Sequence, residues 1–64
     1  MTSKEVIVGL LKDFSQGLTI EELSSRAKLN RTTIRVILEG LKAEGLITQR
    51  NIGAAKLNYW IFNK

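Results

Sequence analysis

Hydrophobic residues in the first two thirds of the chain recur every three or four positions, which is the period of an amphipathic helix. The first stripe consists of Val6, Ile7, Leu10, Leu11 and Phe14. Thr2 and Glu5 have the spacing of a capping box, and Gly17 is a residue at which a helix can end. The pattern predicts a helix over residues 3–15, with its apolar face in the core.

Two shorter stripes follow and predict two helices joined by a tight turn. Thr19 and Glu22 form a second capping box ahead of Ile20, Leu23 and Ala27, which predicts a helix over residues 20–27. Leu18, just before it, is expected to form a strand of one or two residues. After the turn at residues 28–29, Asn30 is a good N-cap. The third stripe, which consists of Ile34, Ile37, Leu38 and Leu41, predicts a helix over residues 31–44 that ends at Gly45.

The period changes after Gly45, where residues 46–52 and 57–62 have the composition of two strands. Residues 53–56 between them predict a hairpin with a four-residue loop, in which Ile52 faces Leu57. One face of this hairpin carries Leu46, Ile52, Leu57, Tyr59 and Ile61, and the other carries Ile47, Trp60 and Phe62 among polar residues. Both faces are partly apolar, so the pattern does not determine which of them is the core face.

The elements therefore make up one domain over residues 1–64, mainly α with a small β-hairpin. Their order is helix, short strand, helix, helix, strand, loop, strand. The 64 residues include neither Cys nor His, which excludes disulfides, thiolate or imidazole metal sites and catalytic triads. There are no paired carboxylates on a predicted cleft and no phosphate-binding loop either, and we expect no enzyme activity, no cofactor and no small-molecule effector. No apolar run approaches the ~20 residues of a membrane span, and no signal peptide is evident, so we expect a cytoplasmic chain.

Charge is distributed unevenly along the sequence. Residues 1–25 have a net charge of −2, whereas residues 26–64 have a net charge of +6. A one-sided excess of Lys and Arg is typical of proteins that bind polyanions, although ordinary surface solubility would also explain it. The basic half contains the predicted helix over residues 31–44, so the polar face of that helix is the first candidate for a binding site.

Two stretches carry a resemblance to a known family. The sequence ELSSRAKLNRTTIRVIL, residues 22–38, resembles the helix-turn-helix pattern of bacterial and archaeal transcriptional regulators, and LEGLKAEGLITQR, residues 38–50, resembles the segment that joins recognition helix to wing in winged helix-turn-helix domains. The resemblance implies a three-helix winged fold that binds double-stranded DNA and regulates transcription near the nucleoid. Lys28 departs from the pattern, because a Gly with positive φ is usual there, and Lys is strained in that conformation.

The polar face of the helix over residues 31–44 can be worked out from its core stripe. With the stripe inward and ~100° per residue, Thr32, Val36 and Glu39 point outward, with Arg31 and Arg35 on one flank and Thr33 on the other. Arg, Thr and Val suit the base edges of the major groove, and the start of a helix attracts phosphate. The expected contacts from this region are Lys28, Asn30, Arg31, Thr32, Thr33, Arg35 and Val36. A merely solvated polar face would not explain an exposed Val36.

The resemblance also implies phosphate contacts from the wing, where Arg50 and Lys56 flank the loop. A single recognition helix offers little contact area, so we expect a weak homodimer on a palindromic site. The first helix and the residues Ile47, Trp60 and Phe62 are candidates for its interface, although Trp60 and Phe62 could equally complete the core. Two other functions stay open: a protein–protein interaction module inside a transcription-related assembly, and nonspecific nucleic-acid binding.

Overall fold

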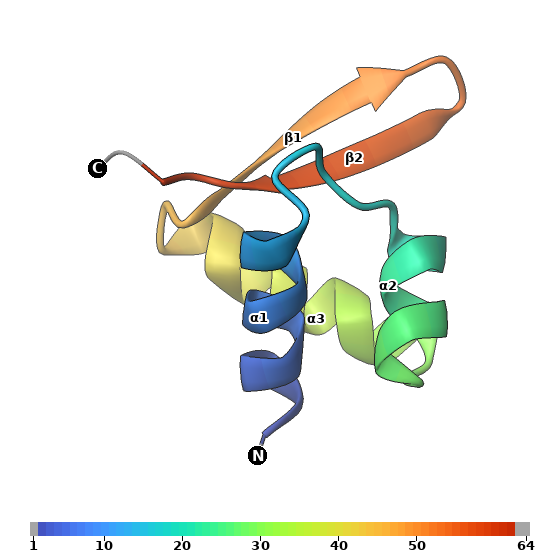
Figure 1. Cartoon of the computed structure of the whole chain (residues 1–64), viewed down its shortest axis with the longest axis vertical. Coiled ribbons are helices and arrows are strands. Elements are labelled where there is room, and N and C mark those ends of the chain that lie inside the picture. Colours follow the sequence, from blue (N-terminus) through green and yellow to red (C-terminus); the bar gives the residue numbers. More distant parts are fainter. Residues whose placement is uncertain (1, 63–64) are drawn as a thin grey trace.

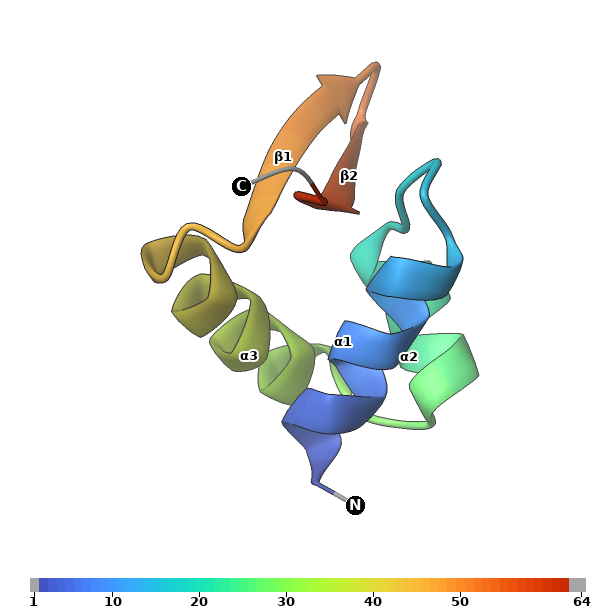
Figure 2. The same ribbon diagram turned by 60° about the vertical axis from the view of Figure 1, so that its left-hand side comes forward.

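The structure, a computed structural model, describes residues 2–62. These residues form three helices, α1 (Ser3–Asp13), α2 (Ile20–Ala27) and α3 (Arg31–Ala43), followed by an antiparallel hairpin of β1 (Ile47–Ile52) and β2 (Ala55–Trp60). The hairpin crosses above the helices, and its loop end lies on the side of α2 (Figure 1). Turning the molecule shows α3 and α2 on either side of α1 below the hairpin (Figure 2). The predicted mainly helical fold with one hairpin is confirmed at this level.

Each helix begins at the residue that the sequence predicts. Thr2 and Thr19 both form complete capping boxes, and the side chain of Asn30 accepts a hydrogen bond from the third residue of α3. These caps satisfy backbone N–H groups that have no partner inside the helix. The ends differ slightly from the prediction, because α1 stops two residues earlier, at Asp13, and α3 one residue earlier, at Ala43.

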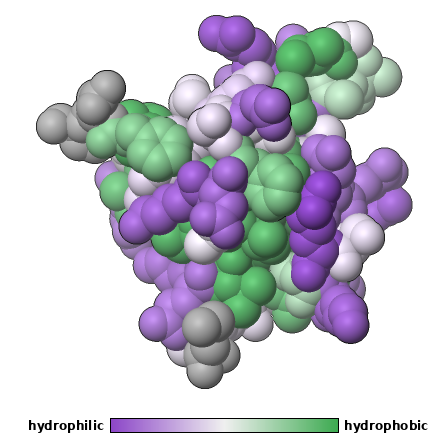
Figure 3. Space-filling view, in the orientation of Figure 1, coloured by the Kyte–Doolittle hydropathy of each residue, from purple (hydrophilic) through white to green (hydrophobic). Residues whose placement is uncertain are grey.

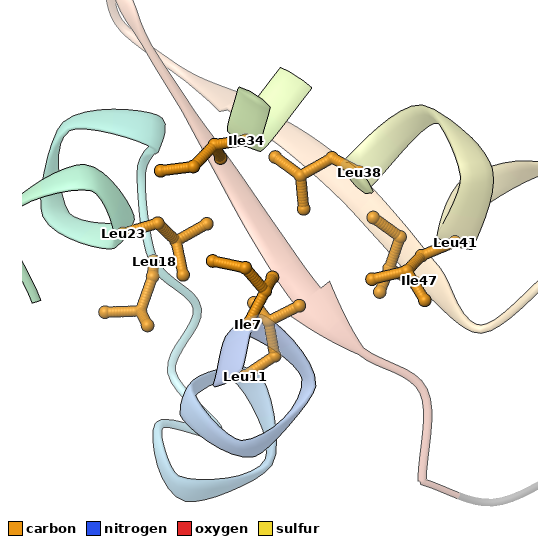
Figure 4. Close-up of a cluster of buried hydrophobic side chains, with 8 residues drawn as sticks. All are labelled: Ile7, Leu11, Leu18, Leu23, Ile34, Leu38, Leu41 and Ile47. Carbon is orange, nitrogen blue, oxygen red and sulfur yellow. The ribbon is translucent and has the colours of Figure 1, made fainter. Parts of the chain in front are cut away.

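The core is a single cluster to which every element except β2 contributes a fully buried aliphatic side chain. Its members are Ile7, Leu11, Leu18, Leu23, Ile34, Leu38, Leu41 and Ile47, each at most 3% exposed. Their side chains converge between α1, α2, α3 and the start of β1 (Figure 4). Burial of aliphatic groups of this kind contributes roughly 1.5–3 kcal/mol per side chain. The apolar stripes of the three helices are therefore core, as predicted.

The hairpin has a shorter loop than the sequence suggested. Ile52 pairs with Ala55, so only residues 53 and 54 lie in the turn, and the predicted four-residue loop with Ile52 opposite Leu57 is wrong. Gly53 has φ 59°, the positive φ that two-residue hairpin turns require. Every pair shifts by two residues; Thr48, for example, lies opposite Tyr59. A shift of two leaves each side chain on its face and changes only its partner.

The inner face of the hairpin is the one that carries Ile47, Asn58 and Trp60. Ile47 is 3% exposed and belongs to the core, so its predicted place in a dimer interface is wrong. Trp60 is partly buried against the core, and the Nζ of Lys12 lies 5.0 Å from the centroid of its ring. Phe62 is 55% exposed. Figure 3 shows apolar surface over α1 as well, between two polar flanks.

Asn58 is a fully buried polar residue that joins the hairpin to the segment before α2. Its backbone exchanges two hydrogen bonds with Leu18, which forms an isolated bridge rather than a regular third strand. Its side-chain amide donates to the carbonyl oxygen of Leu18 at 3.0 Å, and its side-chain oxygen accepts from Nε2 of Gln49 at 2.8 Å. Because the group is 0% exposed, these partners replace water.

Candidate nucleic-acid interface

The turn between α2 and α3 is held by hydrogen bonds at three successive points. Lys28 has φ 58° and ψ 42°, the left-handed conformation expected at this position, and its N–H donates to the carbonyl of Ser24. The hydroxyl of Ser24 in turn donates to the carbonyl of Leu29 at 2.6 Å. Asn30 then caps α3 by accepting from the N–H of Thr33 at 2.8 Å. The start of α3 is therefore fixed relative to α2 without any ligand.

This cap limits what Asn30 can offer a ligand. Its side-chain oxygen is engaged with the backbone of Thr33, so its amide group remains as a donor. The NH2 group alone can donate to a phosphate oxygen. Reading the edge of adenine takes both the oxygen and the NH2 group of an amide, so Asn30 is better suited to a phosphate than to a base. Thr33 itself is partly buried, which makes its side chain the least accessible of the predicted contacts on α3.

The outward face of α3 is as the helical period predicted. Thr32, Arg35, Val36 and Glu39 are all exposed, while Ile34 on the opposite side is fully buried. Val36 is 68% exposed, the largest fraction among the exposed large hydrophobic residues of the described chain. An aliphatic side chain in this position loses contact with water only if something binds to the helix there.

The structure brings three cations to a single cleft of about 350 Å³. Its walls are residues 19–21 at the start of α2, Arg31 and Arg35 on α3, and residues 54–56 at the end of the hairpin. Lys56 thus lines the same cleft as the two arginines although 21 positions separate it from Arg35 in the sequence. Several cations that surround one concavity attract an anion more strongly than the same charges dispersed over a convex surface.

One carboxylate also lies at this cleft. Glu21 in the first turn of α2 forms an ion pair with Arg31 in the first turn of α3, with 3.2 Å between Oε2 and Nη2. Both side chains are well exposed. Sequence reasoning missed Glu21 because no local pattern links two residues on separate helices. The only indication of this ion pair in the sequence is that the first turn of α2 is acidic and the first turn of α3 is basic.

The hairpin separates the two basic residues that were expected to act together. Neighbouring residues of a strand point to opposite faces, and the register places Lys56 opposite Asn51 but Arg50 opposite Leu57. Lys56 is therefore on the face that meets the helices, and Arg50 on the other. Arg50 lines a second, smaller hollow with Tyr59, whose ring centroid is 5.9 Å from its guanidinium carbon.

Residues 2–62 contain no group of three or more acidic side chains placed to hold a metal ion. Within the same range, no helix has the length and hydropathy needed to cross a membrane. No family model matches the chain, and no curated protein is significantly similar to it in sequence.

Proposed function

We propose that the chain is a winged helix-turn-helix domain that binds double-stranded DNA as a transcriptional regulator. In this proposal the first half of α3 enters the major groove, and the hairpin, as the wing, follows the backbone. The observation that carries it is the cleft that Arg31 and Arg35 of α3 line together with Lys56 of the hairpin. Helix and hairpin then contact one continuous anionic surface, which a DNA backbone provides.

The exposed residues of α3 divide between reading bases and holding phosphates. Thr32, Arg35 and Val36 lie on the outward face; Arg can bond guanine, and Val or the methyl of Thr can contact the thymine methyl group. Lys28 and the amide group of Asn30 lie at the turn before the helix and would contact phosphates, which position a domain without reading sequence. Glu39 would repel a phosphate, so the contacts would lie before it.

The two hairpin cations take different roles. Lys56, on the helix-facing side, would bind the stretch of backbone that also meets Arg31 and Arg35. Arg50 points from the opposite face and would contact a phosphate farther along. Two separate contacts extend the binding site along the DNA but carry little sequence information.

Fluorescence anisotropy with a labelled duplex library tests this proposal. Arg35→Ala should cost roughly 1–3 kcal/mol on the preferred site and relax the preference at one base pair. Lys56→Ala should weaken binding to all sequences about equally. The wild-type affinity should fall with salt with a log–log slope of about −4 to −5, as expected for ~4–6 phosphate contacts. Equal, uniform losses for the two variants would contradict the proposed role of α3.

We also propose that two copies pair on DNA, which doubles the contact area of one recognition helix. With Ile47 buried, the remaining candidates for the contact are Phe62, at 55% exposure, the partly buried Trp60 and the apolar surface of α1 (Figure 3). Sedimentation equilibrium with and without a palindromic duplex measures this pairing. A monomer under both conditions would contradict it.

A further inference from the structure

The ion pair between Glu21 and Arg31 lies inside the proposed binding cleft rather than beside it. Both residues are in its wall, and their side chains meet at 3.2 Å. Arg35 and Lys56, the other two cations of the cleft, have no ion-pair partner among residues 2–62. One of the three charges is thus already matched by the protein's own acid, while the other two face solvent.

A carboxylate and a phosphate compete for the same face of a guanidinium group. Both accept hydrogen bonds from its N–H groups with similar geometry. The carboxylate of Glu21 therefore stands, relative to Arg31, where an oxygen of a phosphate would bind. Because Glu21 is fixed in the first turn of α2, a displaced carboxylate would stay at the cleft and repel the phosphate that replaced it.

We propose that the cleft takes one phosphate group of a nucleic-acid backbone and that Glu21 acts as an internal competitor for it. This inference rests on the proposed DNA binding. Arg35 and Lys56 attract the backbone first, and Arg31 joins only after it exchanges Glu21 for the phosphate. The exchange lowers affinity for every duplex, so stable binding depends more on the base contacts of α3.

The size of the effect follows from the exposure of the pair. Ion pairs between solvent-exposed side chains contribute little, and breaking one reduces an equilibrium constant by about five-fold at most. Glu21→Gln should therefore tighten DNA binding by about two- to five-fold at low salt. The gain should shrink as salt rises, because the screening length falls from about 10 Å at 0.1 M to about 3 Å at 1 M.

The chain offers a matched control in its other exposed ion pair. Lys4 and Glu44 meet at 3.4 Å, and their side chains are about as exposed as those of the cleft pair. Glu44 caps the C-terminal end of α3, at the other end of that helix from Arg31. Glu44→Gln removes the same charge and also breaks an ion pair, so it measures the general effect of net charge on DNA binding.

A double-mutant cycle measured by anisotropy on one duplex tests the inference, with circular dichroism to verify that each variant is folded. Glu21→Gln is compared with wild type, and again in the background of Arg31→Gln. We expect the two- to five-fold gain in the first comparison and a smaller gain in the second, where only the repulsion between Glu21 and the phosphate remains. For Glu44→Gln we expect a gain below about 1.5-fold.

Three results would overturn the inference while wild-type DNA binding stands: an undiminished gain in the Arg31→Gln background, an equal gain from Glu44→Gln, or weaker binding by Glu21→Gln. The last would mean that Glu21 positions Arg31 for the ligand. Absence of binding by the wild type and by every variant would instead reject the proposed function, and the inference with it.

Discussion

Asn58→Asp replaces the side-chain NH2 group by an oxygen and barely changes the shape of the residue. In the folded chain that donor bonds the carbonyl of Leu18 at 3.0 Å, and the residue is 0% exposed. An ionised carboxylate there would still accept from Gln49, but it would face the Leu18 carbonyl with no proton between the two oxygens. An uncompensated buried charge costs about 3–5 kcal/mol.

That cost is comparable with the whole stability of a chain of 64 residues, which is expected to be about 3–10 kcal/mol. At pH 7 we therefore expect Asn58→Asp to lose between about a third and all of this stability. Urea titrations followed by the fluorescence of Trp60, the single tryptophan, measure the loss. Asn51→Asp adds the same charge at an exposed position of the same strand pair, and should cost less than about 0.5 kcal/mol.

The effect of pH has a definite sign. Burial disfavours the charged form, so the pKa of the new carboxyl in the folded chain lies above its unfolded value of about 3.9. The protonated acid can donate to the Leu18 carbonyl. The penalty is therefore complete above the folded-state pKa and fades as pH falls toward the unfolded value, by at most about 1.4 kcal/mol per pH unit. A loss below about 1 kcal/mol at pH 7, with no recovery in acid, would refute the buried contact.

Three further predictions concern single positions. A Cβ at Gly17, where φ is 95°, would lie 2.8 Å from the ring of Tyr59, so Gly17→Ala should lower the urea midpoint. A Cβ at Gly40, inside α3, would have no atom within 4 Å, so Gly40→Ala should raise stability by about 0.5–1 kcal/mol. Lys28→Gly relieves the left-handed strain at φ 58° and should raise stability by up to about 1 kcal/mol while weakening DNA binding; a lower urea midpoint would contradict this. Trp60→Ala should lower the free energy of unfolding by about 3 kcal/mol, because the ring packs on the core; its urea titration is followed by circular dichroism, since the variant has no tryptophan. Phe62→Ala should change stability by less than ~0.5 kcal/mol and lower the mass in sedimentation. Equal effects of the two variants in both assays would count against these assignments.

The helices could be predicted from the sequence because their signals are local. Two capping boxes and the Asn30 cap lie within three residues of the groups that they bond, and the apolar stripes matched the buried residues. The left-handed conformation of Lys28 was predictable for the same reason, from its place in the turn. That the chain is a winged helix-turn-helix domain remains a proposal. The helices and the hairpin are consistent with it.

The hairpin register could not be predicted because the hydrophobic pattern is the same for two registers that differ by two residues. Such a shift keeps Ile47 and Trp60 on one face and Thr48 and Tyr59 on the other, so only the turn at Gly53 distinguishes the two registers. Long-range polar contacts were equally hidden. Nothing near Asn58 in the sequence indicates that its partner is a carbonyl 40 residues away.

The central claim is that α3 and the hairpin bind one DNA duplex together. An NMR titration with a mixed-sequence duplex tests it most directly. We predict that the amide signals of residues 30–36 and 54–56 shift together and give one dissociation constant. Shifts confined to α1, or no shifts at low salt, would contradict the claim.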